Sequence, residues 1–196
     1  MRFLLASALL ASAAIATPAL AQDTSAPEGK EFQGVKILAV TGIDRVTSSS
    51  GNQTGLSYGG VVGYDYQAGK AVFGVEGEID GSTAKDCVNN AFAAGDRLCA
   101  KAGRDLYAGV RAGVVVGNKA LLYVKGGYDN GRVVATYTLN NATTKTAQNL
   151  DGWRVGTGVE LPLAKNMLVR AEYRYTNYSD SDVARHQGLV GVGVKF

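Results

Sequence analysis

Apolar and polar residues alternate along most of the chain after residue 34, and this alternation predicts strands rather than helices. The ending GLVGVGVKF, residues 188–196, carries valines at every second position. Segments of this kind cover residues 35–46, 55–67, 70–83, 103–117, 120–131, 150–161, 166–178 and 186–196. The pattern therefore predicts eight β-strands and no long amphipathic helix.

The connections between these strands fall into two classes. Tight turns are predicted at QAGK from residue 67, GNK from residue 117 and PLAKN from residue 162, because Gly, Asn and Pro supply turn geometry. Longer stretches rich in Ser, Thr, Asn and Asp cover residues 47–54, 84–102, 132–149 and 179–185. Three tight turns and four long loops fit eight antiparallel up-and-down strands whose two ends lie on the short-turn side.

Each predicted strand separates its residues into an apolar and a charged face. The apolar face comprises Leu56, Tyr58, Val62, Tyr64, Tyr66, Phe73, Val75, Ile79, Leu106, Val110, Val114, Leu122, Val124, Tyr128, Trp153, Val155, Val159, Val169, Tyr173, Tyr175, Val190, Val192, Val194 and Phe196. The opposite face comprises Asp65, Glu76, Glu78, Asp80, Arg111, Lys125, Arg154, Arg170, Glu172 and Arg174. Alternation alone also fits a soluble lipocalin-like barrel, in which the apolar face points inward.

Glycine indicates that the charged face points inward. The chain has 26 glycines in 196 residues, and many, such as Gly63, Gly109 and Gly158, share the charged face. A solvent-exposed strand is destabilised by glycine, whereas the interior of a narrow barrel needs small residues beside long charged ones. In a membrane the reverse orientation would place several cations in hydrocarbon, at about 2–4 kcal/mol each near the midplane.

An inward charged face predicts a lumen filled by ion pairs, since an unpaired charge in a confined space is costly. We expect Glu76 and Glu78 to pair with Arg111 on the neighbouring strand. The rest of the network is expected to comprise Lys125, Arg154, Arg170, Glu172 and Arg174. Because eight strands enclose a space that side chains just fill, an open pore is not expected.

The aromatic residues of the apolar face gather near the strand ends. Two girdles are predicted, made by Tyr58, Tyr64, Tyr66, Phe73, Tyr128, Trp153, Tyr173 and Tyr175. Such girdles occur in membrane-spanning barrels, where amphipathic rings lie at headgroup depth.

The N-terminus has the features of a signal peptide. Arg2 precedes the apolar run FLLASALLASAAIA, and the small-residue site ALA follows at residues 19–21. The sequence thus predicts a signal peptide at residues 1–21, a flexible periplasmic leader at residues 22–34 and a barrel over residues 35–196. The formal charge of +3 falls to +2 once Arg2 is removed, and no cluster of cations indicates a nucleic-acid partner.

The chemically reactive residues are few. Cys87 and Cys99 are the two cysteines of an exported chain, which favours one disulfide between them. The single histidine, His186, has no accompanying ligand set, so neither a metal nor a cofactor is expected. A surface triad of His186 with Ser179, Asp180, Ser181 or Asp182 is conceivable, but these are ordinary loop residues and we do not expect an enzyme.

Several of these segments together resemble the OmpA-like, opacity-type outer-membrane β-barrel proteins of Gram-negative bacteria. The segments are GGVVGYDYQAGKAVFGVEGEI, DLYAGVRAG, LLYVKGGY, GWRVGTGVE, VRAEYRYTNYSD and HQGLVGVGVKF, and the resemblance covers about residues 33–196. It implies an eight-stranded transmembrane barrel in the outer membrane, reached through the periplasm. The chain differs from full-length OmpA in ending at the barrel, so a peptidoglycan-binding domain is not expected.

The resemblance also implies partners. Val190, Val192, Val194 and Phe196 match the terminal signal that such proteins present to the outer-membrane barrel assembly machinery. Outer-membrane lipid and lipopolysaccharide would surround the barrel, and its surface loops would face host or phage ligands. The sequence predicts a structural barrel that contributes to envelope integrity, with loops available for recognition or adhesion. A small-solute channel gated by the interior ion pairs is the alternative, and a lipid-modifying enzyme comes third.

Overall fold

The computed structural model describes residues 30–48, 51–117, 119–140, 142–179 and 183–196. The expected signal peptide at residues 1–21 and most of the expected leader lie outside this part of the chain. The described strands are β1 (Gly34–Ser48), β2 (Gly51–Ala68), β3 (Ala71–Ser82), β4 (Lys85–Asn89), β5 (Arg97–Val116), β6 (Ala120–Leu139), β7 (Ala142–Ala164), β8 (Met167–Tyr178) and β9 (Val183–Lys195).

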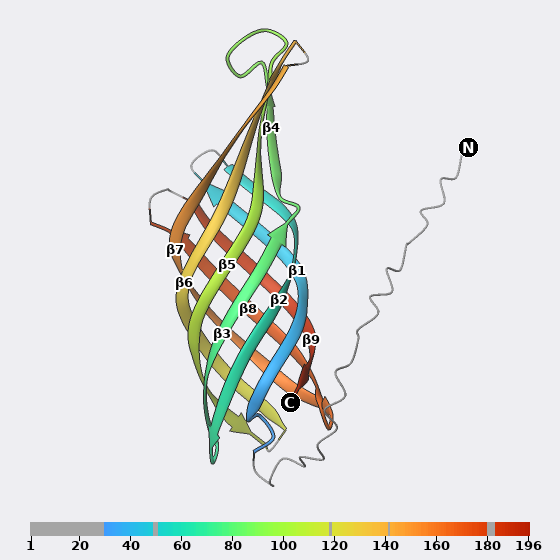
Figure 1. Cartoon of the computed structure of the whole chain (residues 1–196), viewed down its shortest axis with the longest axis vertical. Helices are drawn as coiled ribbons and strands as arrows, with labels where there is room; N and C mark the ends of the chain where they lie inside the picture. The colour runs from blue at the N-terminus through green and yellow to red at the C-terminus, as the bar shows by residue number, and fades with distance from the viewer. Residues whose placement is uncertain (1–29, 49–50, 118, 141, 180–182) are drawn as a thin grey trace, which may run out of the picture.

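Eight of these nine strands form a closed antiparallel barrel. Each strand pairs with its neighbour in the order β3, β2, β1, β9, β8, β7, β6 and β5, and a further pairing between β3 and β5 closes the ring. The strands run at a tilt around a single barrel (Figure 1). The predicted eight-stranded up-and-down fold is therefore confirmed. Among the described residues, no helix is long and apolar enough to span a membrane.

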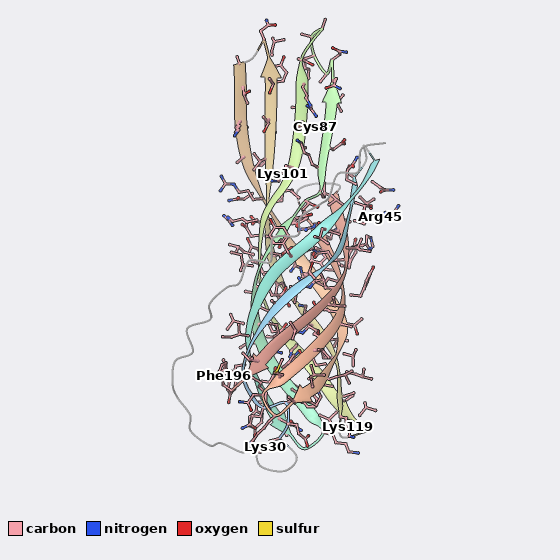
Figure 2. All side chains as sticks on the ribbon, turned by 90° about the vertical axis from the view of Figure 1, so that its right-hand side faces the viewer. Lys30, Arg45, Cys87, Lys101, Lys119 and Phe196 are labelled. Carbon is pink, nitrogen blue, oxygen red and sulfur yellow. A yellow bond between two sulfur atoms is a disulfide. The ribbon has the colours of Figure 1, made fainter. Side chains whose placement is uncertain are left out.

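The remaining strand, β4, belongs to a sheet that continues beyond the barrel. We call this the projecting sheet; it comprises β4, residues 97–102 of β5, residues 132–139 of β6 and residues 142–150 of β7. Figure 2 shows these four segments standing above the ring, with Cys87 and Lys101 on them. The expectation of long loops at residues 84–102 and 132–149 was therefore wrong, because most of both stretches is paired as strands.

The opposite end of the barrel is closed by short turns, as predicted. β2 ends at Ala68 and β3 begins at Ala71, while β7 ends at Ala164 and β8 begins at Met167. Gly69 has a φ of 61°, in the left-handed region that glycine adopts without a steric penalty. These tight connections and the C-terminal Phe196 lie at the end away from the projecting sheet (Figure 2).

Apolar side chains cover the outside of the barrel and charged side chains fill the inside. Val124 is 61% exposed, whereas the next residue, Lys125, is 4% exposed. The same contrast separates Val110 from Arg111 and Trp153 from Arg154. Successive residues of a strand point to opposite faces, so one choice of register fixes all of these environments together. The predicted orientation of the two faces is therefore confirmed.

The last residues of the expected leader are packed against the barrel. Phe32 is buried and belongs to an apolar cluster with Val72, Val115, Leu121 and Tyr123. Its backbone amide donates a hydrogen bond of 2.9 Å to the Gln67 side-chain oxygen. This part of the leader differs from the expected flexible segment because a large aromatic side chain fills the short-turn end of the lumen.

Candidate functional site

The lumen holds the densest cluster of charged groups in the described chain. Seven cations and nine carboxylates are buried there: Lys36, Arg111, Lys125, Arg154, Arg170, Arg174, Arg185, Asp44, Asp65, Glu76, Glu78, Asp80, Asp105, Asp129, Glu160 and Glu172. All eight residues expected to form the interior network are among them. A buried charge is strongly unfavourable without partners, so the arrangement of these pairs determines what the lumen can do.

The group nearest the short-turn end centres on Glu160. Its carboxylate accepts hydrogen bonds from Arg111 at 2.7 Å and from Arg170 at 2.8 Å. Arg111 also donates two hydrogen bonds to Asp65, so its planar guanidinium bridges two carboxylates. Bidentate pairs of this kind combine strong hydrogen bonds with a fixed geometry.

A second group surrounds the ammonium of Lys125. Its Nζ lies 2.5 Å from Glu78 and 2.7 Å from Glu172, and Glu76 lies 3.6 Å away. These three glutamates have carboxylate oxygens within 4.8 Å of one another, a spacing that could hold a metal ion. Because the side-chain ammonium of Lys125 already lies among these three glutamates and neutralises part of their charge, no position between them is free for a metal ion.

The third group, nearest the projecting sheet, is organised by Arg154. Its guanidinium lies 2.9 Å from Glu78, 2.7 Å from Asp105 and 3.0 Å from Asp129. Its Nε also donates a hydrogen bond of 3.0 Å to the hydroxyl of Thr176. One fully buried guanidinium therefore joins carboxylates from three strands.

Several pairs cross the full width of the lumen. β3 and β8 lie on opposite sides of the ring, with three barrel strands between them in either direction. Arg170 on β8 nevertheless lies 2.5 Å from Glu76 on β3, and Arg174 lies 2.8 Å from Asp80. Arg185 on β9 likewise pairs with Asp105 on the opposite strand β5. The lumen is thus bridged at successive heights by ion pairs.

Two buried tyrosines fill the space between the charged groups. The Tyr123 ring lies 4.7 Å from the Arg111 guanidinium and 5.3 Å from that of Arg170. The Tyr107 ring lies 5.0 Å from the Lys125 ammonium. Such cation–π contacts add to the stabilisation of desolvated cations. They also occupy lumen volume that ion pairs alone would leave empty.

The predicted partners within the network were right in part. Arg111 lies 3.4 Å from Glu76, as expected, but Glu78 pairs instead with Lys125, Arg154 and Arg174. The reason is the register between β3 and β5, which sets Arg111 opposite Gly74. Glu76 is then one diagonal step from Arg111, whereas Glu78 is two steps away.

Other members of the network were not anticipated. Lys36, Asp44, Asp105, Asp129, Glu160 and Arg185 are all buried in the lumen. The period of two was the available signal, since Glu160 follows Arg154 by six residues and Asp105 precedes Arg111 by six. Extending each charged face to the end of its predicted strand would have included Asp105, Asp129 and Glu160.

The outer wall carries the expected aromatic residues near both ends of the barrel. Tyr58, Tyr64, Tyr66, Phe73, Tyr128, Trp153 and Tyr173 are exposed, and Tyr175 is partly exposed. Trp153 and Tyr175 have ring centroids 5.6 Å apart, and Tyr175 contacts the His186 ring at 5.0 Å. The Nδ1 atom of His186 lies 2.7 Å from the Tyr173 hydroxyl.

This contact separates His186 from the residues of the conceivable triad. Its described partners are the aromatic rings of the outer wall, and the backbone amide of Ser179 instead bonds the Asp151 carbonyl. Asp180, Ser181 and Asp182 lie outside the described residues.

The last strand carries Val190, Val192, Val194 and Phe196 on its outward face, with the amide of Phe196 bonded to the Val35 carbonyl at 2.8 Å.

The projecting sheet is fastened by a disulfide and by an aspartate. Cys87 on β4 and Cys99 on β5 are directly paired in the register and form the expected disulfide. At the tip, the Asp96 carboxylate accepts hydrogen bonds from three successive backbone amides, those of residues 91–93, at 2.6–2.9 Å. The Tyr137 hydroxyl donates a fourth at 3.1 Å. The tip between β4 and β5 is therefore an ordered turn.

Comparison with known proteins agrees with this architecture. A family model described as the outer membrane protein beta-barrel domain matches residues 7–196. A 25 kDa outer-membrane immunogenic protein of Brucella ovis is 31% identical over 70% of this chain, and the alignment spans 62% of that protein's length. A 22 kDa outer membrane protein of Rhizobium leguminosarum bv. viciae is 28% identical over 79% of this chain and 70% of its own.

Two solved structures share the fold. Neisserial surface protein A has a TM-score of 0.57 and 20% identity, with 84% of this chain and 98% of that chain covered. Ail, the attachment invasion locus protein of Yersinia pestis, has a TM-score of 0.55 and 15% identity, covering 84% and 100%. That structure of Ail is a complex with the heparin analogue sucrose octasulfate.

Proposed function

Because the chain belongs to the outer-membrane protein β-barrel family and lies in the outer membrane of a Gram-negative bacterium, we propose that it is a structural, non-conducting barrel. Its role is to contribute to envelope integrity and to hold the projecting sheet on the outer side of the membrane. The orientation follows from the short turns, which lie at the periplasmic end in barrels of this kind.

The cross-lumen ion pairs carry this proposal. Passage of a solute would require Arg170 to leave Glu76 and Arg174 to leave Asp80, and each step would leave a buried charge without its partner. Removing one partner of a buried pair costs about 3–5 kcal/mol. A path that needs several such steps at once would rarely open, which disfavours the alternative of a gated small-solute channel.

Planar-bilayer recording tests the absence of conductance. We expect the purified wild-type barrel to be silent, and an Arg111→Ala variant to be silent as well, because Arg170 and Lys36 still pair with Glu160 and Glu76. Discrete current steps in the wild type would contradict the proposal.

Envelope integrity is tested in a deletion strain, which we expect to be more sensitive to detergent and chelator and to recover when the wild-type gene is restored.

We further propose that the outward strip of Val190, Val192, Val194 and Phe196 is recognised by the barrel assembly machinery. The strip is accessible along the last strand, and Phe196 is 69% exposed. A Phe196→Ala change should lower the fraction of heat-modifiable barrel in the outer membrane, whereas Leu163→Ala, an equally exposed apolar residue in another strand, should not. Equal assembly of the two variants would contradict this role.

A further inference from the structure

We propose that the outer face of the projecting sheet binds the phosphate groups of glycolipids in the surrounding leaflet. The inference rests on the proposed function only in taking the projecting sheet to lie outside the hydrocarbon region. Five exposed cations define this basic face: Lys85, Arg97, Lys101, Arg132 and Lys145.

Strand register places these five cations on one side of the sheet. Lys85 is paired directly with Lys101, and Thr136 is paired with Lys145. Directly paired residues share a face, and so do residues two apart on one strand. Following these pairings from β4 to β7 brings all five cations to the same face.

The two faces of the projecting sheet differ sharply in chemistry. The basic face carries no Asp or Glu among the described residues of the sheet, and none of its five cations forms an ion pair with a described residue. The opposite face carries Leu98, Val133 and Tyr137, with the Phe92 ring 6.0 Å from that of Tyr137. An ordinary surface mixes charges of both signs, so this segregation points to an anionic ligand.

The basic face is a continuation of the lipid-facing wall of the barrel. On β6, Tyr128 points outward, and Arg132 lies four residues further along on the same side. On β7, Trp153 points outward, and Lys145 is eight residues away on that side. On β5, the bulge between Ala102 and Asp105 reverses the alternation, so Lys101 faces outward although Asp105 faces the lumen.

The continuity of the basic face with the lipid-facing wall indicates which ligand lies beside it. Trp153 is paired with Tyr128, and these rings mark the depth of the headgroups. Arg132 lies about 14 Å further along its strand, at about 3.4 Å per residue. The first groups that the basic face meets beyond the rings are therefore lipid headgroups beside the barrel. Lysine and arginine pair readily with phosphate, and arginine does so in a bidentate manner.

Arg104 provides a second observation at the base of this face. It is paired with Gly81, which is paired in turn with the outward-facing Tyr58. Its Nη1 atom is buried and has no hydrogen-bond partner in the described part of the protein. No described residue forms an ion pair with Arg104, so its positive charge adds to that of the basic face. On β7, the outward carboxylate of Asp151 accepts hydrogen bonds from Tyr128 and Asn130.

Trp153 gives a direct test, because it is the only tryptophan in the chain and lies at the edge of the basic face. The protein is reconstituted in vesicles of brominated phosphatidylcholine, which quenches tryptophan. Unbrominated bisphosphorylated lipid A or its dephosphorylated form is mixed with the brominated lipid before the vesicles are formed. Relief of quenching measures how strongly each lipid displaces phosphatidylcholine from the barrel. Vesicles contain the added lipid in both leaflets, so the result does not depend on the orientation of the barrel.

We expect bisphosphorylated lipid A to be preferred by at least about threefold over the dephosphorylated form, since each cation near an anionic surface contributes up to about fivefold. The preference should fall towards unity at about 0.5 M salt, where charges are screened. It should also disappear in the triple variant K101Q/R104Q/R132Q, which removes the cations of this face that lie nearest the rings. Adding T144K, T146K and Q148K to that variant restores the net charge on the opposite face, and we expect it not to restore the preference.

Equal association of both lipids with the wild type would overturn the proposal, and so would a preference that survives in the triple variant. If Trp153 fluorescence of the wild type changes on addition of soluble heparin but does not distinguish the two forms of lipid A, the proposal is overturned and the ligand is a soluble polyanion. The salt dependence of the wild type keeps the test decisive if the triple variant fails to fold. Conductance is measured separately, so failure of this inference and failure of the proposed function are distinguishable.

Discussion

Arg170 on β8 and Glu76 on β3 meet at 2.5 Å although their strands lie on opposite sides of the barrel. The same Arg170 also lies 2.5 Å from Glu160, so one guanidinium ties β8 to both β3 and β7. Hydrogen bonds between neighbouring strands define the wall of a barrel, but they do not hold opposite walls together. Ion pairs such as Arg170 with Glu76 join opposite walls across the lumen and fill the space between them.

Replacing Arg170 by Ala should lower the free energy of unfolding by about 3–5 kcal/mol, because Glu76 and Glu160 each lose a buried partner. Urea unfolding of the barrel in vesicles measures this change. Lys119, an exposed cation in a short turn, is the matched control, and Lys119→Ala should have an effect near zero. An Arg170→Ala variant as stable as this control would contradict the role assigned to the pair.

The partner residue provides a double-mutant test. Glu76→Gln alone should also destabilise the barrel, since Arg170 and Lys36 each lose a carboxylate. The combined variant R170A/E76Q should be less destabilised than the sum of Arg170→Ala and Glu76→Gln, because the direct contact between Arg170 and Glu76 is lost only once. Strictly additive losses would mean that the two side chains do not act as a pair.

The disulfide should stabilise the projecting sheet and leave the barrel unaffected. Cys87 and Cys99 are separated by 12 residues, and a crosslink of that span contributes about 3 kcal/mol in the chain-entropy model. We expect the variant C87S/C99S to be cleaved faster by protease within residues 85–101, while its barrel still migrates as a folded species on an unboiled gel. Loss of that migration would show that the crosslink supports the ring as well.

The tip of the projecting sheet should respond to acid through Asp96. Desolvation of the buried carboxylate works to raise its pKa, but hydrogen bonds from the amides of Phe92, Ala93 and Ala91 prevail and lower the pKa. A carboxylate with a lowered pKa stabilises the folded tip above the unfolded-chain value of about 3.9. That stabilisation is lost as the pH falls through the lower pKa of the folded tip.

Amide chemical shifts of residues 91–93 follow this transition in a pH titration. We expect them to remain constant down to about pH 4 and to move together below it. In D96N, which cannot ionise, they should already differ at neutral pH and show no such step. A midpoint above about 4 in the wild type would contradict the stated direction.

The barrel strands could be predicted from the sequence because two signals agree in them. In LLYVKGGY, for example, Leu122, Val124 and Tyr128 share one face, and the lone charge, Lys125, shares the other face with Gly127. The charged face then identifies lumen residues such as Arg111 and Arg154 without any structure. Their partners were less predictable, because pairs such as Arg174 with Asp80 depend on which strands are opposite in the closed ring.

The projecting sheet could not be predicted by the same reasoning. Residues 142–149 are polar on both faces and exposed, so they show no apolar alternation. Their strand conformation depends on pairing with residues 132–139, whose VVATYTL pattern is only weakly periodic. Threonine-rich segments have high β-propensity, but composition rich in Ser, Thr and Asn favoured loops. The register that segregates the basic face depends on the β5 bulge, for which we identified no sequence signal.

The inverted arrangement of the two faces is the central claim, and one spin-label measurement tests it most directly. In a C87S/C99S background, single labels are placed at Val124 and Lys125, and a second pair at Val190 and Gly191 keeps the test valid if one site disturbs the fold. Collision rates with oxygen and with a water-soluble nickel complex are then measured in bilayers. We predict high oxygen access at Val124 and Val190, with low access to both reagents at Lys125 and Gly191. High oxygen access at Lys125 and Gly191, or low access at Val124 and Val190, would contradict the account.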